Sequence, residues 1–557
     1  MQSQGLQTLD YLVFLFYFIV VAGYGYWIYQ RKQSKLASSN DFFLAEGSLT
    51  WWAIGASLIA SNISAEQFIG TSGDGFRLGL AIATYEWMAA ATLLIVAIFF
   101  MPIYLKNKIF TMPQFLQQRY SPTVSLIMAI FWLMLYIAVN LTSILYLGAL
   151  AVNTISGIDV TLCMIGMSVF AVVITLGGMK VIGYTDVIQV FFLVLGGLAT
   201  SYLALNMVTD RFGGEGVMDG MNHLLTKAPE HFHMILQKGN PNYPSLPGLA
   251  VLIGGMWIIN LNYWGCNQYI TQRALGADLQ TARNGILFAA FLKLMMPIIV
   301  VLPGIAAYLL HKDGMFQMEM LKDGVLNKDR AYPVLLNLLP TGLKGLSFAA
   351  LTAAVVASMA GKANSISTIF TLDIYKKYIN KSATETQLVR VGRFAVVAAM
   401  VAAVVIAPMM GIDKKGGFEF IQEYTGYVSP GIFALFTLGF FWKRTTSKAA
   451  LFALLGGVTF SILSKYIPTW TGMNDTLFYT AFPDETGTMM IPFMDRMGWV
   501  FLFCVASMVI ITLADPESKT NPQGLEIDAA MFKLSPSFIL GAVVVCLFLT
   551  MVYTYFW

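Results

Sequence analysis

The sequence predicts an all-α polytopic membrane protein with about fourteen transmembrane helices. Two properties lead to this prediction. Of the 557 residues, 57% are hydrophobic and only 11% are charged, whereas a soluble domain carries about 25% charged residues. The apolar stretches are also continuous, which favours helices over a barrel, whose strands alternate apolar and polar residues.

Each predicted span is a mostly apolar segment of about twenty residues, the length that crosses a bilayer. The segments lie near residues 9–30, 50–72, 78–105, 123–153, 159–178, 183–207, 247–272, 281–311, 345–375, 388–410, 417–441, 448–468, 496–515 and 535–556. Basic residues gather in the loops after the odd-numbered spans, for example Lys106, Lys376 and Lys443. By the positive-inside rule these loops are cytoplasmic, so both termini are expected outside the plasma (inner) membrane.

Several protein classes find no support in the sequence. A net charge of +4 over 557 residues does not indicate nucleic-acid binding. There is no Walker motif, nucleophile–base pair or metal cluster in the sequence, so neither an ATP-driven pump nor an enzyme is supported. The four cysteines lie in apolar segments and are expected to be free packing residues.

A polar run interrupts the second predicted span. Between Ser61 and Gln67 the sequence places a carboxylate and two amides inside an apolar stretch. Such groups cost several kcal/mol at bilayer depth unless they face water, protein or a ligand. The run therefore predicts a broken helix that lines a central cavity, which points to transport.

Spans two to six and seven to eleven are predicted to form two inverted repeats, because each set opens on a helix with a polar interruption. The second set opens on Gly254-Gly255, followed by Asn260, Asn262 and Tyr263. This symmetry divides the chain into five parts. They are residues 1–49 (a flanking helix and the first cytoplasmic loop), 50–207 (the first repeat), 208–246 (an extracellular loop), 247–441 (the second repeat) and 442–557 (flanking helices).

Two opposite charges are predicted to balance each other across the cavity. Glu86 in the third span needs a partner, and Lys293 in the eighth span is the obvious candidate. The pair is interpreted as binding a polyhydroxylated substrate, with the carboxylate accepting hydrogen bonds and the ammonium donating them. The alternative is a structural ion pair that fixes helix packing.

Amide side chains on three spans both donate and accept hydrogen bonds, as the hydroxyls of a sugar require. They are Gln67, Asn260 and Gln422. Taken singly, each amide is equally consistent with a contact between helices. The aromatic residues placed to stack on a sugar ring are Tyr85, Tyr263 and Phe418. Isolated aromatic residues are more often ordinary packing.

The ninth span carries Ser358 among small residues, where its hydroxyl can ligate a hard cation. A serine in a membrane helix is usually a packing residue, so this signal is weak alone. Lys362 follows one turn later and has three interpretations. It extends into a cytoplasmic vestibule, pairs with a carboxylate such as Asp186, or supplies a fixed positive charge near a cation site.

Several longer motifs carry a resemblance that extends almost over the whole chain. The motifs occupy residues 51–60, 62–70, 85–87, 185–192, 263–265, 267–269, 291–293 and 421–426. In them the chain resembles the sodium/solute symporter family, closest to its bacterial sodium/galactose and sodium/glucose-type cotransporters. The resemblance implies a 5+5 inverted-repeat fold with flanking helices.

The resemblance also implies roles for individual residues. The sugar contacts of the family fall on Asn62, Gln67, Glu86, Asn260, Lys293 and Gln422. The inner gate falls on Tyr263, and the outer hydrophobic gate falls on Tyr85 and Phe418. The sodium site falls on the backbone carbonyls of Ala60, Ile63 and Ala354 and on the hydroxyl of Ser358.

Three positions depart from the family pattern. The first serine of the sodium-binding pair is Ala357, so one oxygen ligand is missing. Ala89 stands where the family has a serine that contacts sugar, and Thr71 stands where it has the outer-gate methionine. Sodium binding with a water in place of the hydroxyl, proton-coupled or uncoupled transport, and a sugar sensor without net transport are the alternatives that follow from Ala357.

These observations predict a secondary active transporter that imports a galactose- or glucose-like monosaccharide. Sodium is the expected co-substrate, and the coupling is expected to operate by alternating access. The lipid bilayer and the sugar are the expected partners, and no nucleic acid is expected. The sequence leaves open whether the chain forms a homo-oligomer.

Overall fold

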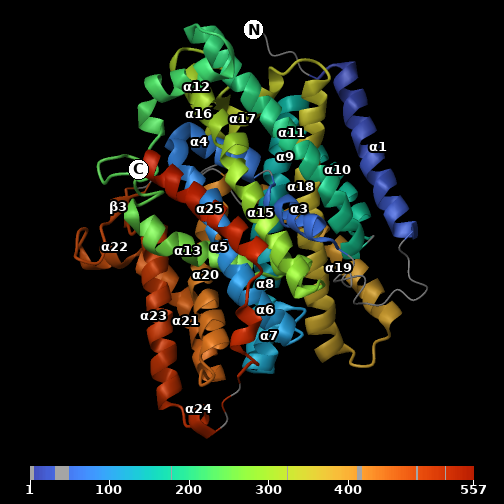
Figure 1. Ribbon diagram of the computed structural model, residues 1–557, viewed down its shortest axis with the longest axis vertical. Coiled ribbons are helices and arrows are strands. Elements are labelled where there is room, and N and C mark those ends of the chain that lie inside the picture. Colours follow the sequence, from blue (N-terminus) through green and yellow to red (C-terminus); the bar gives the residue numbers. More distant parts are fainter. Residues whose placement is uncertain are drawn as a thin grey trace.

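The computed structural model describes residues 6–31, 49–64, 66–176, 178–322, 324–409, 417–484, 487–520, 522 and 524–557. Within these ranges the chain forms a bundle of long helices (Figure 1). Most of the predicted first cytoplasmic loop lies outside the described residues. In the polar run, Ala65 and the side chain of Glu66 also lie outside them.

The helices of the first half, up to the loop after α12, are α1 (Thr8–Arg31), α3 (Trp51–Asn62), η2 (Glu66–Thr71), α4 (Ser72–Leu78), η3 (Gly79–Ala83), α5 (Thr84–Ile95), η4 (Val96–Phe100), α6 (Met101–Lys106), α7 (Met112–Arg119), α8 (Pro122–Met134), η5 (Leu135–Leu141), α9 (Thr142–Ser156), α10 (Val160–Thr175), α11 (Gly178–Phe212), α12 (Gly216–Lys227) and η6 (Pro229–His231).

The helices of the second half are η7 (Val251–Gly255), α13 (Met256–Gly265), α14 (Gln268–Leu275), α15 (Leu279–Val300), α16 (Leu302–Lys312), η8 (Lys328–Arg330), α17 (Ala331–Asn337), α18 (Leu343–Thr368), η9 (Ile369–Ile379), α19 (Glu385–Ile406), η10 (Ala407–Met409), α20 (Gly417–Phe441), α21 (Ser447–Lys465), α22 (Ile467–Thr471), α23 (Phe493–Ala514), α24 (Glu517–Thr520), η12 (Ala529–Phe532) and α25 (Pro536–Tyr555). Two small antiparallel hairpins lie in loops, β1 (Leu321–Lys322) with β2 (Val325–Leu326) and β3 (Phe482–Pro483) with β4 (Met489–Met490).

Eleven helices of the described chain are long and apolar enough to cross a membrane. The predicted spans without such a helix are 50–72, 159–178 and 247–272. The second of these contains α10, which has 16 residues, and the other two are broken into shorter helices. A helix this short reaches across only part of a bilayer. The number of about fourteen spans therefore stays a prediction.

The first predicted helix break is confirmed. α3 ends at Asn62, and Ile63 takes an extended conformation with φ −83° and ψ 103°. The helix resumes as η2 at Glu66. The last carbonyls of a helix have no partners within it, so this break releases backbone oxygens in the middle of the bundle.

The second helix break lies C-terminal to Gly254-Gly255, the glycine pair that opens the second predicted repeat. α13 ends at Gly265 and α14 begins at Gln268. The Asn267 side chain caps α14 by accepting a hydrogen bond from the Tyr269 N–H at 3.1 Å. Gly254 and Gly255 instead lie in the π-helical turn η7. A Cβ on Gly255 would lie 2.6 Å from the Met494 carbonyl, so this glycine permits close packing against α23.

α18 forms the central column of the bundle. The most apolar window of Leu343–Ile379 is 89% buried, against 17% for α25 and 22% for α1. α18 packs against α11, α1 and α10, while α1 and α23 lie at opposite edges of the molecule (Figure 1). The polar side chains of α18 therefore face protein rather than lipid.

Candidate functional site

One cavity collects the residues that the sequence predicts to contact substrate. It lies between the break after α3 and the helices α5, α13, α15 and α20. Its lining includes the six predicted substrate contacts Asn62, Gln67, Glu86, Asn260, Lys293 and Gln422 and the three predicted gate residues Tyr85, Tyr263 and Phe418. Side chains from both halves of the chain thus meet at one place, and their roles in binding remain predictions.

The predicted charge pair forms in the structure. The Lys293 ammonium donates hydrogen bonds to the Glu86 carboxylate and to Asn62 Oδ1. The two charged side chains are 1% and 2% exposed. The ring of Trp264 lies 5.4 Å from the ammonium. A buried pair of this kind is costly to break, because removing one partner leaves the other charge unpaired.

The amides take different positions around this pair. Gln67 Nε2 lies 3.5 Å from Glu86 Oε1. Gln67 Oε1 is buried and has no hydrogen-bond partner among the described residues. Asn260 donates to the Met256 carbonyl at 3.1 Å within its own helix, which leaves its amide oxygen available to accept. Buried polar groups are normally paired, so the free Gln67 oxygen marks a place for a donor from a ligand.

Two layers of side chains close the cavity at its predicted outer end, first a pair of aromatic rings and then a cluster of charges. The rings of Tyr85 and Phe418 meet edge to face with centroids 4.9 Å apart. A Cβ on Gly70 would lie 2.7 Å from Phe418 Cβ, so this approach requires glycine.

Beyond the rings lies a cluster of four charges, which the sequence did not reveal because its members lie in or beside predicted loops, where a charge costs little. Asp74 is fully buried and pairs with Lys328, and Arg77 pairs with Glu419. Burial opposes the charge of Lys328, but the carboxylates of Asp74 and Glu419 outweigh it and raise the pKa of this lysine.

The candidate ion site lies where α3 ends against α18. Ser358 Oγ is 3.2 Å from the carbonyl oxygen of Ala60 and 3.5 Å from that of Ile63. Ala354 and Ala357 are buried on the same helix. Carbonyl and hydroxyl oxygens are the ligands that hard cations take. The residues present therefore fit a sodium ion, with Ala357 adding no oxygen from its side chain.

Tyr269 contacts both helices that form the candidate ion site, α3 and α18. Sequence reasoning assigned it no role. Its hydroxyl donates to the Ser61 carbonyl and lies 3.3 Å from the Ser358 carbonyl. Arg273, one turn further along α14, donates to Ser57 Oγ at 3.0 Å. The only sequence signal was that Tyr269 lies in a motif that carries the family resemblance.

Lys362 lines the central cavity and is 4% exposed. It donates to Asn140 Oδ1 at 2.8 Å, and its ammonium is 4.1 Å from the ring centroid of Tyr269. Asp186, the carboxylate considered as its partner, instead accepts from Ser57 Oγ at 2.6 Å. This position is compatible with a fixed positive charge near the candidate cation site, and the role of Lys362 stays a prediction.

Fold and site together describe a membrane transporter with a broken-helix core. Residues 42–457 match the model of the sodium:solute symporter family. A sodium/glucose cotransporter of Vibrio parahaemolyticus is 46% identical over 100% of this chain and 99% of its own length. A sodium/myo-inositol cotransporter 2 of Homo sapiens is 32% identical over 83% of this chain and 70% of its own length. The chain belongs to the sodium:solute symporter family.

Solved structures agree on the fold. A sodium-coupled sialic acid symporter in an outward-open state aligns with a TM-score of 0.74, covering 91% of this chain and 98% of that structure at 21% identity. A nucleobase-cation-symport-1 family transporter in a closed conformation aligns with a TM-score of 0.50 at 15% identity, covering 88% and 98%. The predicted all-α inverted-repeat class is confirmed. The chain is an integral multi-pass membrane protein and a sodium-coupled solute symporter, with sodium as co-substrate, and it is not an enzyme.

Proposed function

We propose that the chain imports a galactose- or glucose-like monosaccharide together with sodium. One observation carries the choice of a hydroxyl-rich solute. Gln67 Oε1 is buried in the cavity without a partner among the described residues, and leaving such an acceptor unpaired costs about 1–3 kcal/mol. A sugar hydroxyl donates to it.

The remaining cavity groups suit the other hydroxyls of a sugar ring. Glu86 accepts hydrogen bonds, Lys293 donates them, and the amides of Asn260 and Gln422 do both. These groups line the same cavity from separate helices. The glucose and myo-inositol in the names of the relatives are both polyhydroxylated rings, which supports this class of substrate.

For sodium we propose the carbonyls of Ala60, Ile63 and Ala354 and the hydroxyl of Ser358 as ligands. The same break after α3 contributes carbonyls to the ion and the Asn62 and Gln67 side chains to the sugar. Each ligand therefore stabilises the ordered break for the other, and by linkage each raises the other's affinity by the same factor. Because Ala357 lacks a hydroxyl, we expect sodium to bind more weakly than at a site with two serines.

The transport cycle is proposed to alternate between two closures. Separation of Tyr85 from Phe418 and loosening of the four-charge cluster would admit the sugar from outside. Movement of Tyr263 would release it inside. This cycle assumes that both termini lie outside the plasma (inner) membrane and that 50–207 and 247–441 are the two repeats.

Labelled galactose or glucose uptake into proteoliposomes tests the proposal. An inward sodium gradient is expected to drive accumulation, while an equal potassium gradient does not. The Gln67→Ala variant is expected to weaken uptake about tenfold, as loss of a hydrogen bond near a charged pair implies. Accumulation driven by a pH gradient and indifferent to sodium would contradict sodium coupling. Binding of sugar without accumulation would indicate a sensor.

A further inference from the structure

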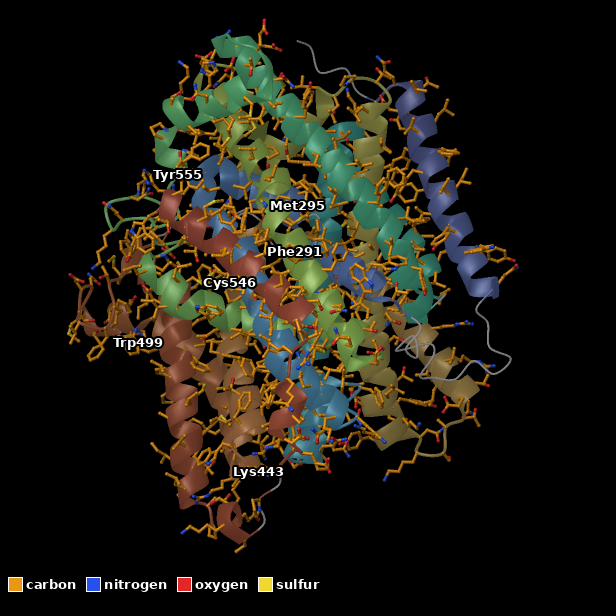
Figure 2. All side chains as sticks on the ribbon, in the orientation of Figure 1. Phe291, Met295, Lys443, Trp499, Cys546 and Tyr555 are labelled. Carbon is orange, nitrogen blue, oxygen red and sulfur yellow. The ribbon has the colours of Figure 1, made fainter. Side chains whose placement is uncertain are left out.

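A second cavity, separate from the central one, lies at the edge of the bundle. Its volume is about 710 Å³. Its walls are η7 and α13 on one side and the first turns of α23 on the other, and the loop 476–480 covers it. Trp499 marks its outer side at the edge of the bundle (Figure 2).

Glycines keep this cavity open. A Cβ placed on Gly498 meets no atom within 4 Å, so it would project into empty space. A Cβ on Gly254, across from it, comes no closer than 3.9 Å to Gly498 Cα. Trp499 donates to the Phe478 carbonyl at 2.8 Å and holds the covering loop in place. The space between η7 and α23 is therefore built into the fold.

Apolar side chains at this cavity are open to the surroundings. Ile253 is 78% exposed, Leu502 is 55% exposed and Trp499 is 42% exposed. In a membrane protein such a face contacts acyl chains, and tryptophan concentrates at the level of the headgroups. The cavity therefore opens toward lipid and near the membrane surface.

The cavity also holds two opposite charges, Asp495 and Lys238, which attract each other but leave one carboxylate oxygen without a hydrogen bond among the described residues. Asp495 Oδ1 is buried and has no hydrogen-bond partner among the described residues. A capping box cannot use this carboxylate, because the N-cap of α23 is Pro492, which has no N–H to donate. Lys238, which also lines the cavity, donates to Thr480 Oγ1 at 3.1 Å. The site thus offers an acceptor for a cationic donor and a cation for an anion.

We propose that this cavity binds a phospholipid with an ethanolamine headgroup. The ammonium of the headgroup donates to Asp495, the phosphate pairs with Lys238, and the acyl chains run along the apolar wall at Ile253 and Leu502. A choline headgroup has no N–H donor and leaves Asp495 unpaired. An anionic headgroup without an amine brings a like charge to the carboxylate. An anionic headgroup that does carry an amine, such as serine, also brings a further negative charge to the carboxylate. The donor requirement and the charge balance together select ethanolamine.

Native mass spectrometry of the full detergent-purified chain tests this selection. The protein is offered equal amounts of phosphatidylethanolamine and phosphatidylcholine with identical acyl chains. Wild type is expected to retain the ethanolamine lipid about tenfold more than the choline lipid, the order of a charge-assisted hydrogen bond. Asp495→Asn is expected to abolish this preference. Glu423→Gln is the matched control, because Glu423 already pairs with Lys465 at 2.8 Å elsewhere on the bundle, and it is expected to keep the preference.

A second variant tests the location without touching a charge. Gly498→Leu fills the cavity and is expected to lower retention of both lipids. Equal retention of the two lipids by wild type, or an undiminished preference in Asp495→Asn, would overturn the proposal. Displacement of the lipid by galactose would show a second sugar site, and equal competition by free phosphoethanolamine would show recognition of the headgroup alone. Either of these results would also overturn it.

Discussion

The central cavity and the candidate ion site start at the same helix break but are built from different parts of the chain. The cavity is lined by side chains from at least five helices, and their chemical types are visible in the sequence. The ion site combines backbone carbonyls at Ala60 and Ile63 with one hydroxyl at Ser358. The first site depends on which residues are present, and the second depends on where a helix stops.

This difference has a consequence for tolerance to substitution. The cavity retains many polar contacts although Ala89 supplies none. The proposed ion site has few ligands, so the missing hydroxyl at Ala357 removes a larger share of them. We therefore expect the two sites to respond separately to mutation, and four experiments rank their responses.

The largest expected effect is on the cavity. Glu86→Gln leaves the buried Lys293 ammonium without its carboxylate, which costs about 3–5 kcal/mol. Sugar uptake is expected to fall at least a hundredfold, and thermal stability is expected to fall with it. The Glu86→Gln, Lys293→Met double variant removes both charges and is expected to regain stability but not uptake. Recovery of uptake in the double variant would show that the pair is only structural.

A smaller effect is expected at the ion site. Ser358→Ala removes the one proposed side-chain ligand and is expected to weaken sodium affinity about tenfold, the order of a bond to a charged group. Sugar affinity at saturating sodium is expected to change little. Ala357→Ser is expected to strengthen sodium affinity. Sodium titration of sugar uptake measures both variants. Ser365→Ala is the control, because that hydroxyl donates to the Gly361 carbonyl of its own helix at 3.1 Å.

A gain is expected in the cavity from Ala89→Ser. The new hydroxyl adds one hydrogen bond, about 0.5–1.5 kcal/mol, or roughly two- to tenfold in sugar affinity. The sodium affinity measured in the absence of sugar is expected to stay the same. Competition uptake with galactose and glucose measures the change, and Ala90→Ser, which does not line the cavity, serves as the control. A shift in sodium affinity instead would contradict the separation of the two sites.

The smallest effect concerns α4, the short helix that follows η2 after the break. His231 is buried, its ring nitrogen Nε2 lies 3.0 Å from the Phe76 carbonyl of α4, and burial lowers its pKa. A lowered pKa in the folded state means that the stabilising contribution is present above the ordinary histidine pKa, about 6.5, and is lost as the pH falls through the lowered value. Acidification is thus expected to lower the melting temperature. His231→Gln should reduce this pH dependence, and sodium and sugar affinities should decline together.

Much of the site was predictable because its chemistry costs energy in lipid. A carboxylate, an ammonium and several amides within apolar spans must face protein, water or a ligand, and their number favours a shared cavity. This reasoning found Glu86, Lys293, Gln67 and Gln422 before their positions were known. Tyr269 and Asn140 escaped it, because a tyrosine or a single asparagine in a membrane helix is common in ordinary packing.

By itself the sequence determined the membrane class, the broken first helix and the pairing of Glu86 with Lys293. Each follows from the cost of a polar group in an apolar segment, which is a local property. Only the tertiary structure decided where the second helix breaks, which carbonyls meet Ser358, and how Asp74, Arg77, Lys328 and Glu419 gather at one end. Every residue has a backbone carbonyl, so the sequence does not mark which carbonyls meet Ser358. Charges in or beside loops cost little, so the sequence does not signal that they gather.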